Sequence, residues 1–276
     1  MNSTPTMNSP SRLDEAWLRE ECAALELPWQ IRVVDEIAST SDALRTAAQQ
    51  GEEHGIVLFA ESQTAGRGRR DNRWVTPPGL DLMFSLLLRP TEPISFWPRL
   101  TTLVALSICL AIEEELPLKP QIKWPNDIYL NSRKVSGLLA EVVATPKGMA
   151  LILGIGLNVN SREFPPELAD TATSLIQALP PGVTIRALDR QQIALRLLKD
   201  LAQQIQHLES GFTDAIAAVR QRSWLIGKQI RATVDGQEIY GRAVDINQEG
   251  HLILSLADGS LRTLNSADGV RQVVSA

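Results

Sequence analysis

The 276-residue sequence contains few residues of the kinds that bind metals or cross-link a chain: two cysteines and three histidines. Cys22 and Cys109 lie far apart in apolar, helix-like contexts, so neither a disulfide framework nor a zinc site can be built from them. His54, His207 and His251 show no metal-ligand spacing. These absences argue against a disulfide-stapled secreted domain and predict a reducing, cytoplasmic location.

The sequence also lacks a long apolar run and an excess of positive charge. Its longest apolar stretch, residues 103–112, is too short to span a bilayer. Residues 1–11 have no secretory-signal pattern and are expected to form a disordered tail. The formal net charge is -5, which does not favour bulk binding of nucleic acid. We therefore expect neither a membrane nor a DNA partner.

Periodicity and turn signals predict an α+β protein with a mixed or antiparallel sheet and helices on one side of it. Strands are expected at 31–37, 56–61, 80–88, 120–124, 127–130, 134–144 and 149–159, and helices at 12–27, 39–50, 99–115 and 186–222. From about residue 226 the pattern changes to short strands at 229–234, 237–246, 251–255 and 260–264, joined by Asp-Gly and Glu-Gly turns. This last part is typical of a small SH3-like β-barrel. The expected division is 1–27 (tail and helix), 28–222 (main domain) and 223–276 (barrel).

A glycine- and arginine-rich segment, Gly66-Arg67-Gly68-Arg69-Arg70, stands out in the polar loop that follows the second predicted strand. Its two glycines let the backbone approach a ligand closely, and its guanidinium groups suit carboxylates and phosphates. Trp74 follows shortly afterwards. We call residues 66–70 the arginine segment. The same residues are also consistent with a solvated basic loop or a nucleic-acid contact.

Two further segments place charged side chains beside predicted turns. In Lys123-Trp124-Pro125-Asn126-Asp127, Pro125 fixes a turn and Asp127 offers one carboxylate, which suits Mg²⁺ at a phosphate site. In 133–141, Lys134 begins an otherwise apolar strand, and Gly137 marks a bulge or a close backbone approach. Each segment taken alone is equally consistent with an ordinary turn.

A fourth segment, Gly154-Ile155-Gly156-Leu157-Asn158, ends an apolar strand. It lacks the third glycine and the following helix of a dinucleotide fingerprint, and the chain contains no Walker A loop and no G-x-S-x-G elbow. The glycines leave room for a flat ring, with Asn158 as a polar contact. A sheet edge that needs only small residues is the alternative.

In their order and spacing, these four segments resemble the signature of the biotin protein ligases, and the resemblance covers roughly residues 30–276. It implies a catalytic domain of the biotin/lipoate ligase type that makes biotinyl-AMP from biotin and ATP with Mg²⁺. The biotin would then pass to a lysine on a biotin carboxyl carrier protein of acetyl-CoA carboxylase. A monomer and a homodimer both remain open. Thr173-Ser174-Leu175 resembles a further short element near the nucleotide.

The resemblance also implies roles for individual residues. Catalysis would rest on Lys134, Arg69 and Arg67, and Asp127 would hold the Mg²⁺. The biotin site would comprise Ser39, Thr40, Ser41, Gln63, Arg67, Gly68, Arg69, Lys134 and Gly137. The ATP site would comprise Arg69, Trp74, Lys123, Asn126, Lys134 and Asn158.

Two positions depart from the family pattern. Asp71 stands where glycine is common, which bears on how well the arginine segment retains the adenylate, and Ser41 stands where asparagine is common. A lipoate-protein ligase is the alternative enzyme, but it lacks this form of arginine segment. A biotin-responsive or nucleic-acid-binding regulator is the alternative from another class. Since only about 30 residues precede the first catalytic strand, we expect no N-terminal DNA-binding repressor domain.

Overall fold

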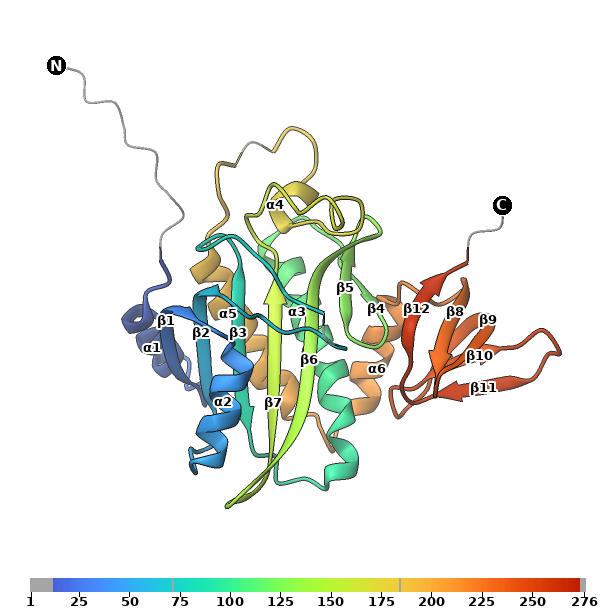
Figure 1. Cartoon of the computed structure of the whole chain (residues 1–276), viewed down its shortest axis with the longest axis horizontal. Helices are drawn as coiled ribbons and strands as arrows, with labels where there is room; N and C mark the ends of the chain where they lie inside the picture. The colour runs from blue at the N-terminus through green and yellow to red at the C-terminus, as the bar shows by residue number, and fades with distance from the viewer. Residues whose placement is uncertain (1–11, 71, 184, 274–276) are drawn as a thin grey trace.

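The computed structural model describes residues 12–70, 72–183 and 185–273. The expected disordered tail and Asp71 therefore lie outside the described residues. Within them, two sheets are formed: a seven-stranded sheet in the order β1-β2-β3-β7-β6-β5-β4 and a five-stranded sheet near the C-terminus. Figure 1 shows the large sheet flanked by helices, with the smaller sheet beside it.

The seven-stranded sheet is mixed, as predicted. β1 and β2 are parallel and joined by α2, whereas the other neighbouring pairs are antiparallel. The strands are β1 (Gln30–Ile37), β2 (Ile56–Gln63), β3 (Leu82–Leu88), β4 (Gln121–Lys123), β5 (Asp127–Leu130), β6 (Arg133–Thr145) and β7 (Gly148–Leu157). The helices are α1 (Glu15–Ala24), α2 (Thr40–Gln49), α3 (Pro98–Glu115), α4 (Leu175–Ala178), α5 (Arg190–Ile205) and α6 (Phe212–Gln221), with a short 3₁₀ turn at Ile94–Phe96.

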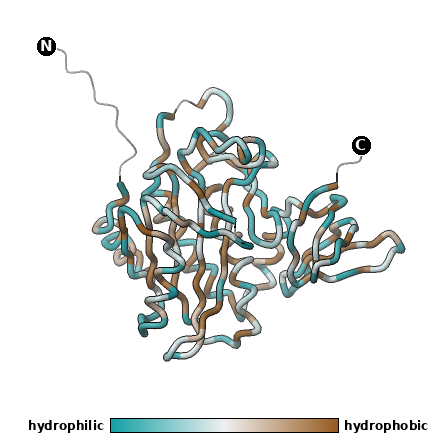
Figure 2. Tube along the Cα trace, in the orientation of Figure 1, coloured by the Kyte–Doolittle hydropathy of each residue, from teal (hydrophilic) through white to brown (hydrophobic). Residues whose placement is uncertain are grey.

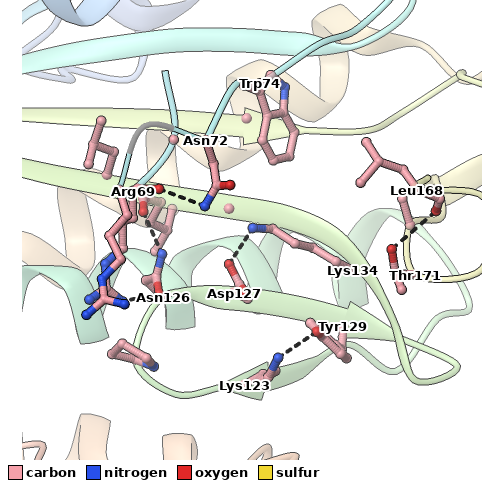
Figure 3. Close-up of a pocket in the computed structure, with 18 of the residues that line it drawn as sticks. Arg69, Asn72, Trp74, Lys123, Asn126, Asp127, Tyr129, Lys134, Leu168 and Thr171 are labelled. Atoms are coloured by element: carbon pink, nitrogen blue, oxygen red, sulfur yellow. Dashed lines mark hydrogen bonds and ion pairs between the residues drawn. The ribbon is translucent and has the colours of Figure 1, made fainter. Parts of the chain in front are cut away.

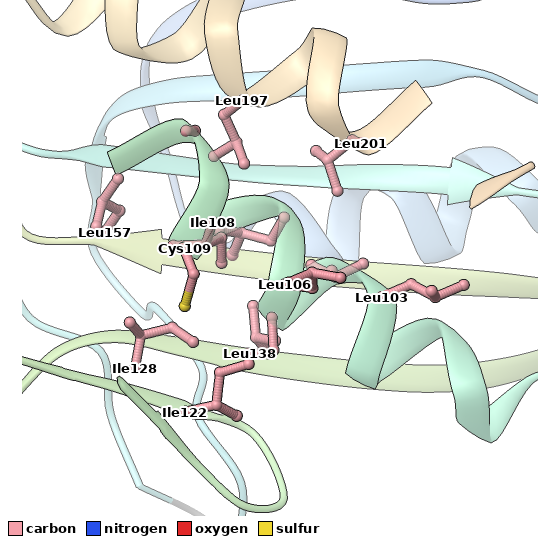
Figure 4. Packing of buried hydrophobic residues seen from close by; sticks show 14 of the residues in the cluster. Leu103, Leu106, Ile108, Cys109, Ile122, Ile128, Leu138, Leu157, Leu197 and Leu201 are labelled. Carbon is pink, nitrogen blue, oxygen red and sulfur yellow. The ribbon is translucent and has the colours of Figure 1, made fainter. Parts of the chain in front are cut away.

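One face of the large sheet carries the main hydrophobic core. Alternate residues of β3 and β7, such as Phe84 and Leu153, point to this face and pack against α3 and α5. α3 is apolar nearly all round, with ten buried residues, because it is covered by the sheet on one side and by α5 and α6 on others. Figure 4 shows Leu106 and Cys109 of α3 between the sheet and α5. In Figure 2 the most hydrophobic segments are the central strands and the helix behind them.

The opposite face is covered by α2 over only part of its length. Leu44 and Ala48 of α2 pack on Ile56, Leu58 and Ile152 in a second, smaller core. The expectation of helices on one side only was therefore wrong. The strands were located correctly, but α2 joins the parallel strands β1 and β2, and such a connection must cross over one face of the sheet. Beyond the N-terminal end of α2, β7 presents Gly154 and Gly156 on this face. This uncovered glycine surface is where the cavity described below lies.

The C-terminal module, residues 225–273, contains an antiparallel sheet in the order β11-β10-β9-β8-β12. Its strands are β8 (Gln229–Val234), β9 (Gln237–Ile246), β10 (Leu252–Ser255), β11 (Leu261–Leu264) and β12 (Asp268–Gln272). Four of them were predicted, and β12 was not. β11 and β12 do not pair among the described residues, so the predicted small β-domain is present without closure of its sheet into a barrel.

The module is fixed to the rest of the chain by direct contacts. Trp124 Nε1 donates to the carbonyl of Gly250 at 3.0 Å, and Arg220 Nε donates to the carbonyl of Ile246 at 2.6 Å. Ile122 forms a parallel bridge to Ser223 just before the module begins. No described helix is long and apolar enough to cross a membrane.

Candidate active site

A cavity of about 790 Å³ opens on the glycine surface of the large sheet and extends to the C-terminal module. All but one of the residues expected to bind biotin, ATP or Mg²⁺ line it. These are Thr40, Ser41, Gln63, Arg67, Gly68, Arg69, Trp74, Lys123, Asn126, Asp127, Lys134, Gly137 and Asn158. Segments that are far apart in the sequence thus meet at one place, and Figure 3 shows part of this set.

The exception is Ser39. It is buried at the N-cap of α2, and its hydroxyl accepts from the backbone N–H of Asp42 at 3.3 Å. Such a serine satisfies one of the free N–H groups at the start of a helix. Its proposed contact with biotin remains a prediction, whereas its capping role is visible.

The floor of the cavity is made of glycines because side chains would not fit. A Cβ added at Gly156 would lie 2.3 Å from Cε2 of Trp74, and one at Gly137 would lie 2.8 Å from Nζ of Lys134. Gly137 and Gly156 are register partners on neighbouring strands. The indole of Trp74 therefore lies flat against the backbone of β6 and β7, with the Lys134 ammonium 5.6 Å from its ring centroid.

A hydroxyl cluster occupies the end of the cavity next to α2. The Thr40 hydroxyl lies 2.8 Å from that of Ser85 and 3.2 Å from Oε1 of Gln63, which also accepts from the Thr40 backbone N–H. The Ser41 hydroxyl lies 3.0 Å from that of Ser85. Ser85 was not anticipated from the sequence. The signal was available, because it is the one polar residue in the buried run 82–88.

Arg67 is held by two carboxylates. Its guanidinium donates to both oxygens of Glu141 on β6, at 2.8 and 3.0 Å, and to Asp42 on α2 at 2.7 Å. Arg45 also reaches Glu141, at 2.7 Å. The two-pronged contact with Glu141 fixes the plane of the Arg67 guanidinium.

Arg69 is held between the large sheet and the C-terminal module. Nη1 donates to Oδ1 of Asn126 at 2.9 Å, and Nη2 donates to Oδ1 of Asp268 at 2.9 Å. Arg70 pairs with the other oxygen of Asp268. Asn126 is itself anchored, because its Nδ2 donates to the carbonyl of Leu138 at 2.8 Å.

Lys134 pairs with Asp127 at 2.6 Å, as Figure 3 shows. Its backbone is fixed on both sides: its N–H donates to the carbonyl of Thr171, and its carbonyl accepts from the N–H of Thr173. Asn158 belongs to the same arrangement, since its Nδ2 donates to the carbonyl of Thr173 at 2.9 Å. Ser174 caps the N-terminus of α4. The 173–175 element predicted near the nucleotide therefore supports Lys134.

Lys123 lies at the far end of the cavity among aromatic rings. Its Nζ donates to the Tyr129 hydroxyl at 2.8 Å and lies 4.8 and 5.9 Å from the ring centroids of Tyr129 and Trp224. Burial lowers the pKa of Lys123 and raises the pKa of Tyr129 to about 12. At neutral pH the tyrosine is therefore a neutral hydroxyl.

Seven arginine and lysine side chains line this cavity in a protein of net charge -5, among them Arg67, Arg69 and Lys134. Arg67, Arg69 and Lys134 each retain 34% side-chain exposure, so each can still reach a ligand. Each is paired with a carboxylate. The described residues contain no group of three or more His, Cys, Asp or Glu that could hold a metal ion by themselves. Guanidinium and ammonium groups gathered in this way suit small anions such as carboxylates and phosphates.

Comparisons with known proteins agree with this arrangement. Residues 33–158 match the Biotin/lipoate A/B protein ligase family, and residues 225–268 match the Biotin protein ligase C terminal domain. The "Bifunctional ligase/repressor BirA" of Bacillus subtilis is 34% identical over 95% of this chain and 80% of its own length. The "Biotin--[acetyl-CoA-carboxylase] ligase" of Mycobacterium tuberculosis is 34% identical over 88% of this chain and 90% of its own length. A solved structure of the Aquifex aeolicus biotin protein ligase in complex with biotin and ATP superposes with a TM-score of 0.78 at 29% identity, covering 88% of this chain and 99% of that one.

Proposed function

This chain belongs to the biotin/lipoate A/B protein ligase family, and we propose that it works as an ATP-dependent biotin protein ligase. It joins biotin to ATP to form biotinyl-5'-AMP and then transfers the biotinyl group to a lysine of a biotin carboxyl carrier protein. The observation that carries the proposal is the convergence of Arg67, Arg69 and Lys134 on one cavity of an acidic protein. Two anions, a carboxylate and a nucleotide phosphate, must meet there.

In the first half-reaction the biotin carboxylate attacks the α-phosphorus of ATP, and pyrophosphate leaves. The repulsion between the two anions falls when fixed cations lie where negative charge accumulates. Lys134 takes this position in our proposal, since its backbone is held by Thr171 and Thr173 and its ammonium is directed into the cavity. Arg67 binds the biotin carboxylate, and Arg69 binds the α-phosphate.

Biotin lies beside Gly154 with its ureido ring at the hydroxyl cluster. Thr40, Ser41 and Gln63 supply donors and acceptors there, and Ser85 orients the two hydroxyls. The other end of the cavity takes the nucleotide. The adenine stacks on the indole of Trp74, while Lys123 and Asn126 lie near the phosphates. Gly68, Gly137 and Asn158 complete the two subsites.

The residues present fit a magnesium ion that a nucleotide brings with it. Asp127 supplies one carboxylate, and a hard cation at a phosphate site uses few protein ligands, with phosphate oxygens and water completing its shell. Mg²⁺ there would neutralise charge on the phosphates. With Asp127 in this role, the Lys134 ammonium, which pairs with Asp127 in the structure, would be available to the substrates.

In the second half-reaction a neutral lysine amine of the carrier attacks the acyl carbon of the mixed anhydride. The bond from that carbon to the AMP oxygen breaks, and an amide, AMP and a proton are formed. AMP is a good leaving group, so the site's main task is to keep water from the anhydride until the carrier arrives. The arginine segment, whose residues 67–70 line the cavity, serves this purpose.

Transfer to a carrier is the direct test. The protein is incubated with ATP, Mg²⁺, biotin and a carboxyl carrier domain, and the carrier is analysed by mass spectrometry. One biotinyl group on one lysine, with no lipoyl group when lipoate replaces biotin, is the expected result. Lipoyl transfer would favour the lipoate ligase instead, and strongly salt-dependent oligonucleotide binding would revive the regulator.

We further propose that the protein acts in the cytoplasm, in keeping with its two free, buried cysteines. The absence of a DNA partner remains a prediction. So do the division of the chain near residue 222 and the choice between monomer and homodimer.

A further inference from the structure

The carboxylate of Asp268 reaches from the C-terminal module to the arginine segment. Its Oδ1 accepts from Nη2 of Arg69 at 2.9 Å, and its Oδ2 accepts from Arg70, 198 positions earlier in the chain. Arg69 also lies within 3.4 Å of the carbonyl of Ala267. One acidic side chain thus holds two consecutive arginines, and 24% of it remains exposed.

The position of Asp268 is set by its own module and not by the arginines. It is the first residue of β12 and is the register partner of Thr233 on β8, and the register shifts between it and Arg271. An irregularity of this kind at the start of an edge strand redirects side chains. Here it places the carboxylate at the rim of the cavity, among residues 267–272 that line it.

The arginine segment is therefore held at both ends by carboxylates from different parts of the fold. Glu141 and Asp42 hold Arg67, and Asp268 holds Arg69 and Arg70. The contacts at Arg67 belong to the large sheet and α2. The contact at Arg69 and Arg70 is the module's direct ion-pair link to the segment within the part of the chain that the structure describes.

We propose that Asp268 is a positioning residue through which the C-terminal module keeps the arginine segment closed over the reactive anhydride. The proposal rests on the proposed ligase function. With Asp268 in place, Arg69 stays beside Asn126 and the α-phosphate, and water is kept from the acyl carbon. Without it, the segment keeps its hold at Arg67 but loses the one at Arg69 and Arg70.

When Asp268 is removed, we expect the biotinyl-AMP intermediate to be hydrolysed before the biotinyl group reaches the carrier. Water adds its oxygen to the acyl carbon, the bond to the AMP oxygen breaks, and biotin and AMP are released with both protons of the water. Formation of the anhydride slows because Arg69 is held less firmly at the α-phosphate, but it still proceeds, since the described hydrogen bonds and ion pairs of Lys134, Asp127 and Arg67 do not involve Asp268. The ratio of AMP released without carrier to biotin-dependent ATP–pyrophosphate exchange therefore measures the role of Asp268.

The experiment compares full-length wild type with Asp268→Asn, Asp268→Glu and a matched control, Glu238→Gln. Glu238 also lies in the C-terminal module and pairs with an arginine, Arg231, but neither residue is among those that line the cavity. The first measurement is the rate of AMP release without carrier, divided by the rate of biotin-dependent ATP–pyrophosphate exchange. The second is the rate of tryptic cleavage after Arg69 and Arg70, quantified by mass spectrometry. The second needs no activity and can be read without any ligand.

We expect Asp268→Asn to raise the ratio and the cleavage rate by about fivefold or more, because the partly exposed ion pairs of Asp268 with Arg69 and Arg70 are lost. Asp268→Glu should restore most of the wild-type behaviour, and Glu238→Gln should leave both unchanged. Unchanged trypsin cleavage and an unchanged ratio in Asp268→Asn would overturn the proposal. Absence of biotin-dependent exchange in the wild type itself would refute the ligase function instead, so the two failures are distinguishable.

Discussion

The indole of Trp74 lies against the backbone of Gly156, so closely that a Cβ on residue 156 would be 2.3 Å from the ring. The contact joins the loop after the arginine segment to the centre of the large sheet. It also fixes where a flat purine can lie if it stacks on this indole. The glycines of residues 154–158 were expected to leave room for a flat ring, and at Gly156 the ring in that space is the indole of Trp74 itself.

Gly156→Ala should displace Trp74 and weaken ATP binding while leaving the fold intact. The strand pairing of residue 156 uses only backbone groups, whereas the indole must move by several tenths of an ångström or more. Loss of one base-stacking contact corresponds to an increase in the KM for ATP of about tenfold. Steady-state kinetics with a melting curve tests this, and an unchanged KM for ATP would contradict the placement of adenine on Trp74.

Gly154→Ala is the matched partner, two residues earlier on the same face of β7. Its Cβ would lie 2.7 Å from the Ser41 hydroxyl and would disturb the hydroxyl cluster. We expect it to raise the KM for biotin and to leave the KM for ATP nearly unchanged. The opposite pattern would mean that the two ends of the cavity are assigned the wrong way round.

Arg67→Lys should behave almost like Arg67→Ala. The contact with both oxygens of Glu141 depends on the planar guanidinium, which an ammonium does not reproduce. If Arg67 also grips the biotin carboxylate, each variant should raise the KM for biotin on the order of tenfold to a hundredfold. Isothermal titration with biotin alone gives an independent measure, and a lysine that restores affinity would argue against a two-pronged contact.

Asp81 supports the strand end that leads into Asn158. Its Oδ1 accepts from the backbone N–H groups of Val159, Asn160 and Ser161 at 2.7, 3.2 and 3.2 Å, and its Oδ2 accepts from the Ser161 hydroxyl. Asp81→Ala would leave the buried N–H groups of Val159 and Ser161 without this acceptor, whereas the N–H of Asn160 also donates to the carbonyl of Leu80 at 3.1 Å. The free energy of unfolding should fall by about 3 kcal/mol. Urea denaturation measures the loss.

Asp81→Asn is the control, because it keeps one acceptor oxygen. Burial raises the pKa of Asp81 in the fold, so its stabilising contribution is fully present below the unfolded pKa of about 3.9 and is lost as pH rises through the folded value. The asparagine has no such titration. The stability advantage of wild type over Asp81→Asn should therefore shrink as pH rises from about 4, and an advantage that grows with pH would contradict the burial argument.

Much of the architecture followed from short-range patterns. The apolar run in 149–159 and the turns around Pro125 and Asp258 located strands that the structure confirms. β12 was missed because Asp268–Gln272 contains no apolar alternation and pairs with β8, about 35 residues earlier. Sequence signals of strand formation are local, whereas this pairing is not.

The candidate site shows the same division. The segments around Arg67, Lys123, Lys134 and Gly154 were found from their composition, and the fold brings them to one cavity. The carboxylates that pair with the arginines were not found, whereas Asp127, the partner of Lys134, was already among the expected site residues. Glu141 and Asp268 lie 74 and 199 positions from the arginines they hold, and nothing in their own sequence surroundings indicates that contact.

Biotin-dependent ATP–pyrophosphate exchange on wild type and Lys134→Ala tests the central claim most directly. We predict exchange that requires biotin and Mg²⁺, does not occur with lipoate, and falls by about a hundredfold to a thousandfold in the variant. Circular dichroism on the same samples establishes that Lys134→Ala is folded. Exchange that survives in folded Lys134→Ala would contradict the role of Lys134, and a folded wild type with no biotin-dependent exchange would contradict the ligase function itself.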